Sequence, residues 1–373
     1  MASTQAPYVI HLICSSGFYG AEKVVSNLCK EMPGKNMAVL CLTNKNHCAL
    51  AFEKTVVNAG VKFYISENHT MRSLAVLKEL TVAHSSVVIH AHGYKEVFVA
   101  CLFKRLRQCK IIVTQHGFTA RNIKSNLYNL ANLTLCRWAG VERVLCVSQE
   151  IYDRYQKFGI PSHRLTLLPN GVTLPKSLDK EDAKIQMEAR YDLPPGVPLV
   201  LFAGRLSDEK DPILFTSIVR EMMALQVNFF ALVAGDGPLK NAVCEAVEQN
   251  GLSRCLKVLG FVGDINTLLA ATDILLLTST TEGVPMVILE AMTQKCVVVS
   301  ADVGGISGII VIDQEGVLVG SRDPSQYAKH CVELLNNELK LKKIAENAER
   351  KVREQFCLSK QIPIYRDIYG SKG

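Results

Sequence analysis

Short apolar runs alternate along the chain with segments in which apolar residues recur at helical spacing. In the first half, helical spacing covers 21–31, 72–83 and 149–158, for example. The apolar runs between such segments have the length and hydrophobicity of strands that are buried on both faces. Strands that alternate with helices predict βαβ units and a parallel sheet. The predicted strands of this half are 8–14, 37–42, 61–65, 87–90, 110–114, 144–147 and 165–168.

The alternation is interrupted once and then resumes. Pro169-Asn170-Gly171 ends the first series, and Leu193-Pro194-Pro195-Gly196 follows a helix-prone acidic segment at 179–191. Because clusters of proline and glycine mark turns and linkers, we place a domain junction at 169–197. The second series has predicted strands at 198–203, 228–233, 256–259, 273–278, 296–300 and 317–319, and a helical tail follows from residue 323.

Two such series predict an α/β protein with two Rossmann-like, doubly wound parallel-sheet domains that face a cleft. We expect the N-terminal domain over 1–175 and the C-terminal domain over 176–355. The last helical segment, 356–373, is expected to cross back to the N-terminal domain. A length of 373 residues is enough for two domains with separate cores.

The composition excludes several classes of protein. A hydrophobic fraction of 48% argues against disorder, and no run reaches the ~18 apolar residues that a membrane-spanning helix needs. Residues 1–7 lack the basic start and apolar run of a signal peptide, so we expect a cytoplasmic protein. The 13 cysteines lie mostly in apolar runs and form no C-x-x-C pair, which argues against a disulfide framework or structural zinc.

Charge is distributed unevenly between the two halves. Residues 1–175 contain 20 Lys and Arg against 9 Asp and Glu, whereas residues 176–373 contain 22 against 26. A basic half attracts phosphate-bearing substrates, anionic lipid headgroups or nucleic acid, or serves only for solubility. The cluster Lys104-Arg105-Leu106-Arg107 fits a membrane surface, or simply favourable charge at a helix C-terminus. No basic and aromatic recognition motif is present, so we expect no nucleic-acid partner.

The segment from Thr281 to Glu290 contains two carboxylates at the junction of a predicted strand and an apolar helix. Glu282 lies in the loop at the carboxyl end of the strand, where open α/β sheets bind ligands. Pro285 suits the first turn of this helix, where no backbone N–H is required. The backbone amides of its neighbours Gly283, Val284, Met286 and Val287 would face an anion at the helix N-terminus. Glu290 lies among apolar residues and needs a polar partner if it is buried. Two solvated acids are the alternative interpretation.

Three further groups lie at predicted strand ends. Arg205 and Lys210 flank the loop after the strand 198–203 and are able to neutralise a diphosphate, or to pair with nearby acids. Gly17-Phe18-Tyr19-Gly20-Ala21-Glu22 brings backbone N–H groups near the start of a helix but lacks the dinucleotide-binding spacing.

Histidines form the third group. His90 and His92 share a strand face, and His116 precedes a glycine at the end of another strand. A metal site needs a third ligand, so we expect no metal. A core histidine that is satisfied by a backbone carbonyl is the alternative, for His90 above all and also for His92 and His116. His116 is expected to meet a polar substrate.

In this order, the motifs resemble the large retaining glycosyltransferase family of the GT-B fold, family four (glycosyltransferase group 1). The resemblance covers essentially the whole chain. Its elements are the loop 17–22, His92 and His116, Pro169-Asn170-Gly171-Val172, Gly204-Arg205-Leu206 with Lys210, Gly235-Asp236-Gly237-Pro238, and Glu282 with Glu290.

The resemblance implies roles for these residues. Arg205 and Lys210 would hold the diphosphate of a nucleoside diphosphate sugar, and Glu290 would accept hydrogen bonds from the ribose. Glu282 would engage sugar hydroxyls, and the amides of 283–287 would complete the donor site. Further residues would lie opposite the donor: Gly17 and Gly20 at the phosphate, His116 near the reacting sugar, and His92 beside His116.

The resemblance therefore implies a retaining, metal-independent transferase without a bound cofactor, using a UDP- or GDP-sugar as co-substrate. A glycan or lipid-linked acceptor in cell-surface polysaccharide biosynthesis is expected, with peripheral contact at the inner face of an anionic membrane. Gly308 stands where the family usually has a glutamate. This departure keeps an inactive sugar-nucleotide-binding homologue open as an alternative, beside a GT-B-fold sugar-nucleotide epimerase.

Overall fold

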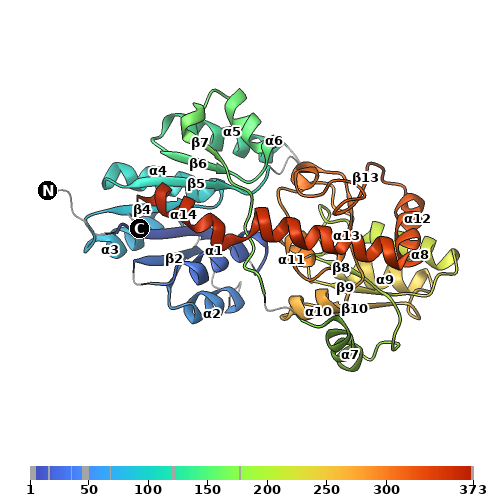
Figure 1. Cartoon of the computed structure of the whole chain (residues 1–373). Helices are drawn as coiled ribbons and strands as arrows, with labels where there is room; N and C mark the ends of the chain where they lie inside the picture. The colour runs from blue at the N-terminus through green and yellow to red at the C-terminus, as the bar shows by residue number, and fades with distance from the viewer. Residues whose placement is uncertain are drawn as a thin grey trace. The chain divides into compact units, whose positions relative to one another are not determined.

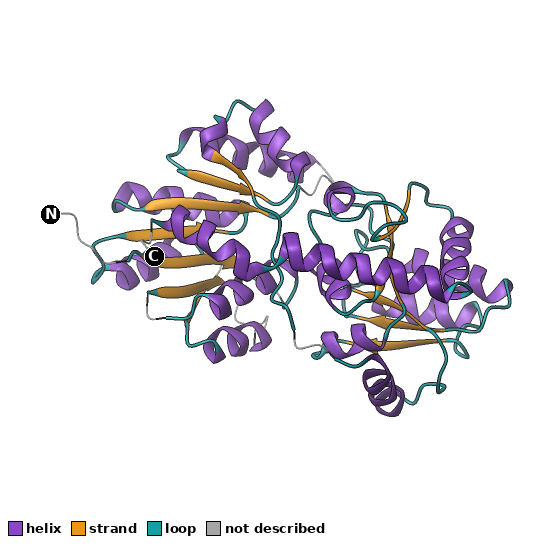
Figure 2. Cartoon of the chain, viewed as in Figure 1, coloured by secondary structure: helices purple, strands orange, loops and turns teal. Residues whose placement is uncertain are grey.

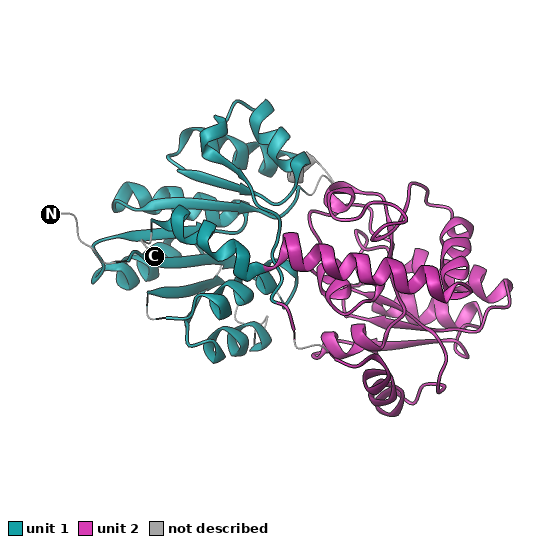
Figure 3. Ribbon diagram, viewed as in Figure 1, with its two compact units in different colours: residues 1–173, 358–373 teal, residues 174–357 magenta. Residues whose placement is uncertain are grey.

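The computed structural model describes residues 6–370 except 16, 35, 44–49, 68, 119–122 and 176–177. It consists of two compact units (Figure 3). Unit 1 contains residues 1–173 and 358–373, and unit 2 contains residues 174–357. The sequence predicts these bounds at 175/176 and 355/356, within two residues of the observed positions.

Seven strands form a parallel sheet in the described part of unit 1, in the order β3-β2-β1-β4-β5-β6-β7 (Figure 1). The order reverses between β1 and β4, and such a switch point opens a crevice at the carboxyl ends of the strands. The strands are β1 (Tyr8–Cys14), β2 (Met37–Leu42), β3 (Lys62–Ser66), β4 (Val87–Ala91), β5 (Lys110–Gln115), β6 (Arg143–Cys146) and β7 (Leu165–Leu167).

Helices in unit 1 connect successive strands and pack against one another in neighbouring pairs, α1 with α2, α3 with α4, and α4 with α5. The ribbon in Figure 2 shows them around the strands of this unit. They are α1 (Gly20–Glu31), α2 (Leu50–Asn58), α3 (Thr70–Thr81), α4 (Tyr94–Leu106), α5 (Ile123–Trp138) and α6 (Gln149–Lys157), with the 3-10 turn η1 (Ser162–Arg164).

The described part of unit 2 forms a six-stranded parallel sheet in the order β10-β9-β8-β11-β12-β13. Its switch point lies between β8 and β11, which pair through Ile274 with Val200 and Leu275 with Leu201. The strands are β8 (Leu199–Ala203), β9 (Phe230–Ala234), β10 (Leu256–Gly260), β11 (Ile274–Leu277), β12 (Val297–Ala301) and β13 (Gly316–Val319).

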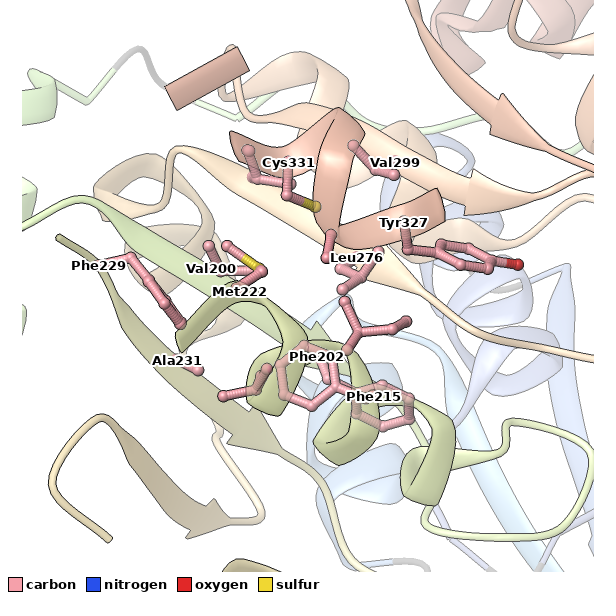
Figure 4. Close-up of a cluster of buried hydrophobic side chains, with 14 of the residues drawn as sticks. Val200, Phe202, Phe215, Met222, Phe229, Ala231, Leu276, Val299, Tyr327 and Cys331 are labelled. Atoms are coloured by element: carbon pink, nitrogen blue, oxygen red, sulfur yellow. The ribbon is translucent and has the colours of Figure 1, made fainter. Parts of the chain in front are cut away.

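The helices of unit 2 also pack in pairs, α8 with α9 and α12, and α10 with α7 and α11. Phe202 of β8 and Phe215 of α8 lie together in the apolar core with Tyr327 of α12 (Figure 4). The helices are α7 (Lys180–Tyr191), α8 (Pro212–Ala224), α9 (Lys240–Gln249), α10 (Ile265–Ala271), α11 (Met286–Thr293), α12 (Pro324–Leu335) and α13 (Glu338–Lys351), with η2 (Gly304–Gly308) and the π-helical turn η3 (Val352–Phe356).

The predicted fold class is confirmed, since both series of strands form parallel sheets with a switch point. The largest shift of a strand start is at β9, which begins at Phe230 rather than residue 228.

The last helix, α14 (Leu358–Tyr369), belongs to unit 1. Leu358 N–H donates to the Val172 carbonyl (3.0 Å), and Gln361 Nε2 donates to the Pro169 carbonyl (3.2 Å). Gly171 lies beneath them, where a Cβ would come within 2.6 Å of the Gln361 amide oxygen. The Pro169-Asn170-Gly171 turn therefore contacts α14 directly, and it also ends the first series of strands.

Candidate active site

Two loops of unit 2 meet at its switch point. The loop 204–211 follows β8, and the loop 278–285 follows β11, the strand that pairs with β8. Thr280 N–H donates to the Glu209 carbonyl (2.8 Å), which joins the two loops directly. Because both loops leave the carboxyl ends of adjacent parallel strands, their side chains share one crevice.

Lys210 and Glu282 form an ion pair across these loops. The Ser279 hydroxyl donates to the same carboxylate oxygen of Glu282 (2.6 Å). The Glu282 side chain is 8% exposed, against 24% for Lys210, so the carboxylate is more enclosed than its partner. The sequence predicts separate roles for these two residues, and the structure shows that they are in direct contact.

Arg322, which the sequence analysis missed, holds this pair of loops in place. Its guanidinium donates to the carbonyls of Thr278 (2.7 Å) and Ser279 (3.1 Å) and forms an ion pair with Asp211. Asp211 has a left-handed backbone (φ 44°) and caps α8 by accepting from Leu214 N–H (3.1 Å). The only sequence signal for Arg322 is its place just before the Asp-Pro start of α12.

Two glycines are required by close backbone contacts around the loops. A Cβ at Gly235 would come within 1.8 Å of the Gly204 carbonyl oxygen, so the motif 235–238 has a steric function beside the β8 loop. A Cβ at Gly304 would come within 1.9 Å of the Glu282 carbonyl oxygen, and Gly304 has a φ of +57°. Because Gly304 has no side chain, the backbone of Glu282 packs directly against it.

Helix α11 begins at Met286, and Pro285 is its N-cap, one position before the first turn to which the sequence assigns it. The backbone of Gly283 to Val287 thus forms the entry to this helix, where amide groups favour an anion. Glu290 lies further along α11 and is 8% exposed. Arg205, at the end of β8, is half-buried. Both flank the same switch point.

The Gly304–Gly308 turn shows what the missing glutamate changes. Gly308 is exposed, and nothing lies within 4 Å of the position that its Cβ would occupy. A longer side chain at this position would extend into open space.

Unit 1 has a chain of three histidines at its own switch point. His11 Nδ1 lies 2.9 Å from His92 Nε2, and His92 Nδ1 lies 3.1 Å from His116 Nε2. His11, in the centre of β1, was missed by the sequence analysis; a histidine in a fully apolar strand was the available signal. The β1–β4 register aligns His11 with His90, and no sequence pattern gives that register.

His90 is a buried core histidine with both ring nitrogens in use. Nδ1 lies 2.7 Å from the Tyr369 hydroxyl of α14, and Nε2 lies 2.7 Å from the Thr114 hydroxyl. The alternative interpretation is therefore right that His90 is a core histidine, but its partners are two hydroxyls and not the expected backbone carbonyl.

His11 also supplies the third imidazole that a metal site would need, since ring nitrogens of His11, His90 and His92 lie within 4.8 Å of one another. Hydrogen bonds already use both nitrogens of His90 and of His92. These residues suit hydrogen bonding better than metal ligation, and metal independence stays a prediction.

The histidine cluster is held neutral. Burial lowers the pKa of His11 to about 3 and that of His116 to about 4. Burial, and then the neighbouring histidines, lower the pKa of His90 and of His92 well below the usual value. Each imidazole in this cluster therefore has one N–H and one acceptor nitrogen at neutral pH.

His92 and His116 line a pocket of about 170 Å³ in unit 1. The side-chain amide oxygen Oε1 of Gln115 accepts from Asn132 Nδ2 (2.9 Å) and from the hydroxyl of buried Tyr155 (2.9 Å). Tyr94 and Tyr128 stack beside it with ring centroids 4.7 Å apart. Of these lining residues, the sequence predicts only the two histidines. Gly93, Tyr94, Gln115 and Gly117 adjoin them in the sequence, whereas Tyr128, Asn129 and Asn132 come from helix α5. The pocket is lined by His92, Gly93, Tyr94, Gln115, His116, Gly117, Tyr128, Asn129 and Asn132.

Gly17 and Gly20 lie between β1 and α1. Gly20 is the first residue of α1 and has open space at its Cβ position, whereas Gly17 faces the Tyr19 ring. The Glu22 carboxylate accepts from Tyr19 N–H (3.1 Å), which closes the first turn of the helix. The helix N-terminus is therefore capped from within unit 1, and phosphate contact by the glycines stays a prediction.

The basic cluster at 104–107 is partly occupied by intramolecular contacts. Lys104 pairs with Glu142 and donates to the Gly140 carbonyl (2.7 Å), and Arg107 donates to the His84 carbonyl. Arg105 is exposed. Two of the three cations thus contact neighbouring segments of unit 1, and both the helix-terminus and the membrane interpretations of the cluster stay predictions.

Comparison with known proteins gives matches along both units. The model of the family described as Glycosyltransferase Family 4 matches residues 18–175, and that of Glycosyl transferases group 1 matches residues 184–351. The Escherichia coli UDP-Gal:alpha-D-GlcNAc-diphosphoundecaprenol alpha-1,3-galactosyltransferase is 24% identical over 309 residues, 80% of this chain and 79% of that protein. The Bacillus anthracis N-acetyl-alpha-D-glucosaminyl L-malate synthase is 24% identical over 379 residues and covers 96% of both chains.

Solved structures share the fold. Anabaena HepE in complex with UDP-glucose superposes with a TM-score of 0.86 at 18% identity, covering 98% of this chain and all of the other. The likeness confirms two Rossmann-like domains of the GT-B type. None of the helices in the described ranges has both the length and the apolar character that crossing a membrane requires.

The neutral histidines make stability depend on pH. Unfolded histidines bind protons below their usual pKa of 6.5, whereas folded His11 and His116 stay neutral until about 3 and about 4. Acidification therefore favours the unfolded state throughout that window, and stability present above pH 6.5 is lost as the pH falls. We expect each of the two to lower the free energy of unfolding by about 2 kcal/mol near pH ~5.

Urea unfolding of the full chain at neutral pH and near pH ~5 measures this loss. The matched control is His163→Gln, at an exposed position in η1, which should show the same loss as the unmodified chain. Equal stability at the two pH values would contradict a neutral histidine cluster.

Proposed function

We propose that this chain, which belongs to the glycosyltransferases of group 1, moves a sugar from a nucleoside diphosphate sugar to a glycan or lipid-linked acceptor. The transferase activity follows from the family, and the nature of donor and acceptor is the proposal. The observation that carries it is the contact between Lys210 and Glu282 at the switch point of unit 2. A cation, a carboxylate and a helix N-terminus in one crevice suit a diphosphate joined to a polyhydroxylated ring.

Unit 2 binds the donor, a UDP- or GDP-sugar, in this proposal. Arg205 and Lys210 hold the diphosphate, with the backbone amides of 283–287 beside them. Diphosphate oxygens compete with Glu282 for the Lys210 ammonium, so donor binding frees carboxylate lone pairs for the sugar hydroxyls. Glu290 accepts from the ribose. HepE, the Anabaena protein solved with UDP-glucose, supports a nucleotide sugar as donor.

The negative charge that develops on the diphosphate during the reaction explains why two cations, Arg205 and Lys210, lie in the donor site of this proposal. The bond between the sugar and the diphosphate breaks, which leaves an oxocarbenium-like sugar and a more negative diphosphate. Preorganised cations at the leaving group stabilise this charge without reorganisation. We assign no covalent nucleophile, because in this proposal Glu282 accepts hydrogen bonds from the sugar hydroxyls and Glu290 from the ribose. The acceptor instead attacks on the face that the diphosphate leaves, with retention of configuration and without a metal or a bound cofactor.

Unit 1 binds the acceptor or the reacting sugar in its pocket. His116 and His92 offer imidazole nitrogens there, amides come from Gln115 and Asn132, and Tyr94 with Tyr128 offers an aromatic face. Amides and aromatic faces together suit a sugar ring. Gly17 and Gly20 remain assigned to the donor phosphate from unit 1. The Escherichia coli relative acts on a diphosphoundecaprenol-linked sugar, which supports a lipid-linked acceptor in polysaccharide biosynthesis.

A lipid-linked acceptor places the protein at the inner face of a membrane as a cytoplasmic, peripheral enzyme. The neighbouring helices α4 and α5 expose large apolar side chains: Tyr94, Phe98, Leu106, Leu127, Leu130 and Trp138. The guanidinium carbon of Arg137 lies 4.5 Å from the centroid of the Trp138 ring. Arg105, which directly precedes Leu106 in the sequence, is exposed. Apolar and aromatic side chains with flanking cations suit an anionic membrane surface.

Removing either diphosphate cation tests the donor site. Arg205→Ala and Lys210→Ala should each lower turnover about a hundredfold or more, because a lost preorganised charge contact costs about 2.7–4 kcal/mol in the transition state. Initial rates of nucleoside diphosphate release from a panel of UDP- and GDP-sugars measure this. Lys342→Ala, which removes an exposed cation of α13 in the same unit, is the control with unchanged rates. Full activity in both site variants would refute the assignment.

Flotation with vesicles tests the membrane contact. The double variant Leu127→Ser with Trp138→Ser should reduce the fraction that floats with anionic vesicles several-fold, since both side chains are among the most exposed apolar groups of α5. Leu339→Ser, at an 84% exposed leucine of unit 2, should float like the unmodified chain. Equal flotation of all three proteins, or no flotation at any lipid charge, would remove the membrane contact from the proposal.

A further inference from the structure

The three histidines of unit 1 form a hydrogen-bonded chain from the centre of the sheet to the pocket. His11 is fully buried in β1, His92 follows β4, and His116 follows β5 and lines the pocket. Two N···N contacts of 2.9 and 3.1 Å join them in that order. Each contact requires one ring nitrogen with a proton and one without.

A neutral chain of this kind has only two proton arrangements. In the outward arrangement, His11 Nδ1–H donates to His92 Nε2, and His92 Nδ1–H donates to His116 Nε2. His116 then has its proton on Nδ1, and His11 Nε2 is an acceptor. In the inward arrangement every donor is reversed, His116 Nδ1 is an acceptor, and His11 has an N–H on Nε2.

His11 Nε2 decides between the two arrangements. It is buried and has no hydrogen-bond partner within the described part of the chain. Buried N–H groups without a partner are rarer in proteins than buried acceptors without one. The inward arrangement would place such an N–H at His11. The outward arrangement avoids it.

The surroundings of His11 leave its free nitrogen no other partner. The His90 ring lies 5.0 Å away and has both nitrogens bound to hydroxyls, of Tyr369 and Thr114. The Tyr369 ring meets His11 edge-on at 6.4 Å between centroids, and its hydroxyl is the one bound to His90. Within the described ranges, the one hydrogen bond of the His11 ring is therefore its contact with His92.

We propose that His11 is a positioning residue that fixes, through His92, the tautomer of His116, so that His116 presents Nδ1–H to the pocket. The pocket then takes a ligand group that accepts a hydrogen bond, such as a hydroxyl or phosphate oxygen of a sugar-bearing substrate. This role rests on the proposed function of the pocket. His116 Nδ1 itself has no hydrogen-bond partner among the described residues, so it is available to such a group.

The tautomer also assigns a chemical role. A nitrogen that already has its proton donates a hydrogen bond and does not remove the proton of an acceptor hydroxyl. In transfer with retention, that proton goes to the departing diphosphate oxygen as the new bond to the sugar forms. His116 therefore orients the ligand as a donor, and the base is the leaving group.

Nitrogen NMR of the histidine rings tests the proposal directly. The full chain, labelled with ¹⁵N in histidine and free of ligand, is examined near neutral pH by long-range proton–nitrogen correlation. We expect the pattern of a protonated Nδ1 and an unprotonated Nε2 for His116, His92 and His11. A protonated Nε2 on His116 would overturn the proposal. Because no substrate is present, this result is independent of whether the chain transfers a sugar.

Two variants at position 11 then separate positioning from packing. His11→Phe keeps an aromatic ring but offers no N–H, so His92 is no longer restricted to one tautomer and His116 should show both. His11→Asn presents both an amide N–H and a carbonyl oxygen to His92, so it also leaves both tautomers possible and His116 should again show both. An unchanged His116 pattern in folded His11→Phe would overturn the role of His11. Should that variant fail to fold, the spectrum of the unmodified chain still decides the proposal.

Discussion

Pairing of β8 with β11 is the constraint on which the proposed donor site depends. These strands are neighbours in the sheet although more than 70 residues separate Lys210 from Glu282 in the sequence. The switch in strand order opens the crevice there, and Arg322 then ties the β11 loop to Asp211 at the start of α8. The charged groups are thereby held in place before a ligand arrives, which is what charge stabilisation in a transition state requires.

The two units share a sheet topology with one switch point, but the groups at that point are charged in unit 2 and neutral in unit 1. Unit 2 has a charged pair at its switch point, with a cation and a carboxylate in contact. Unit 1 has neutral imidazoles that burial keeps uncharged, next to an amide-rich pocket. Charge suits a diphosphate, whereas neutral donors and acceptors suit hydroxyl groups. The chemistry of each crevice therefore agrees with the division of donor and acceptor between the units.

Much of the fold was predictable because parallel strands that are buried on both faces are continuous apolar runs. The same regularity placed Arg205, Lys210, Glu282 and His116 at strand ends. Contacts that depend on register or on distant helices were not predictable: His11 beside His90, Arg322 on the β11 loop, and Tyr369 on His90. Pro285 was displaced by one position because a proline is compatible with both the N-cap and the first turn.

The central claim is that unit 2 binds a nucleoside diphosphate through its switch-point residues. Calorimetric titration of the full chain with UDP and with GDP tests it most directly, in the unmodified protein and in Glu290→Gln. We expect saturable binding of at least one nucleotide, with an affinity about tenfold or more weaker in the variant, because a hydrogen bond to a charged group contributes about 1.5–3 kcal/mol. Absence of binding by both nucleotides, or equal affinity in the variant, would contradict it.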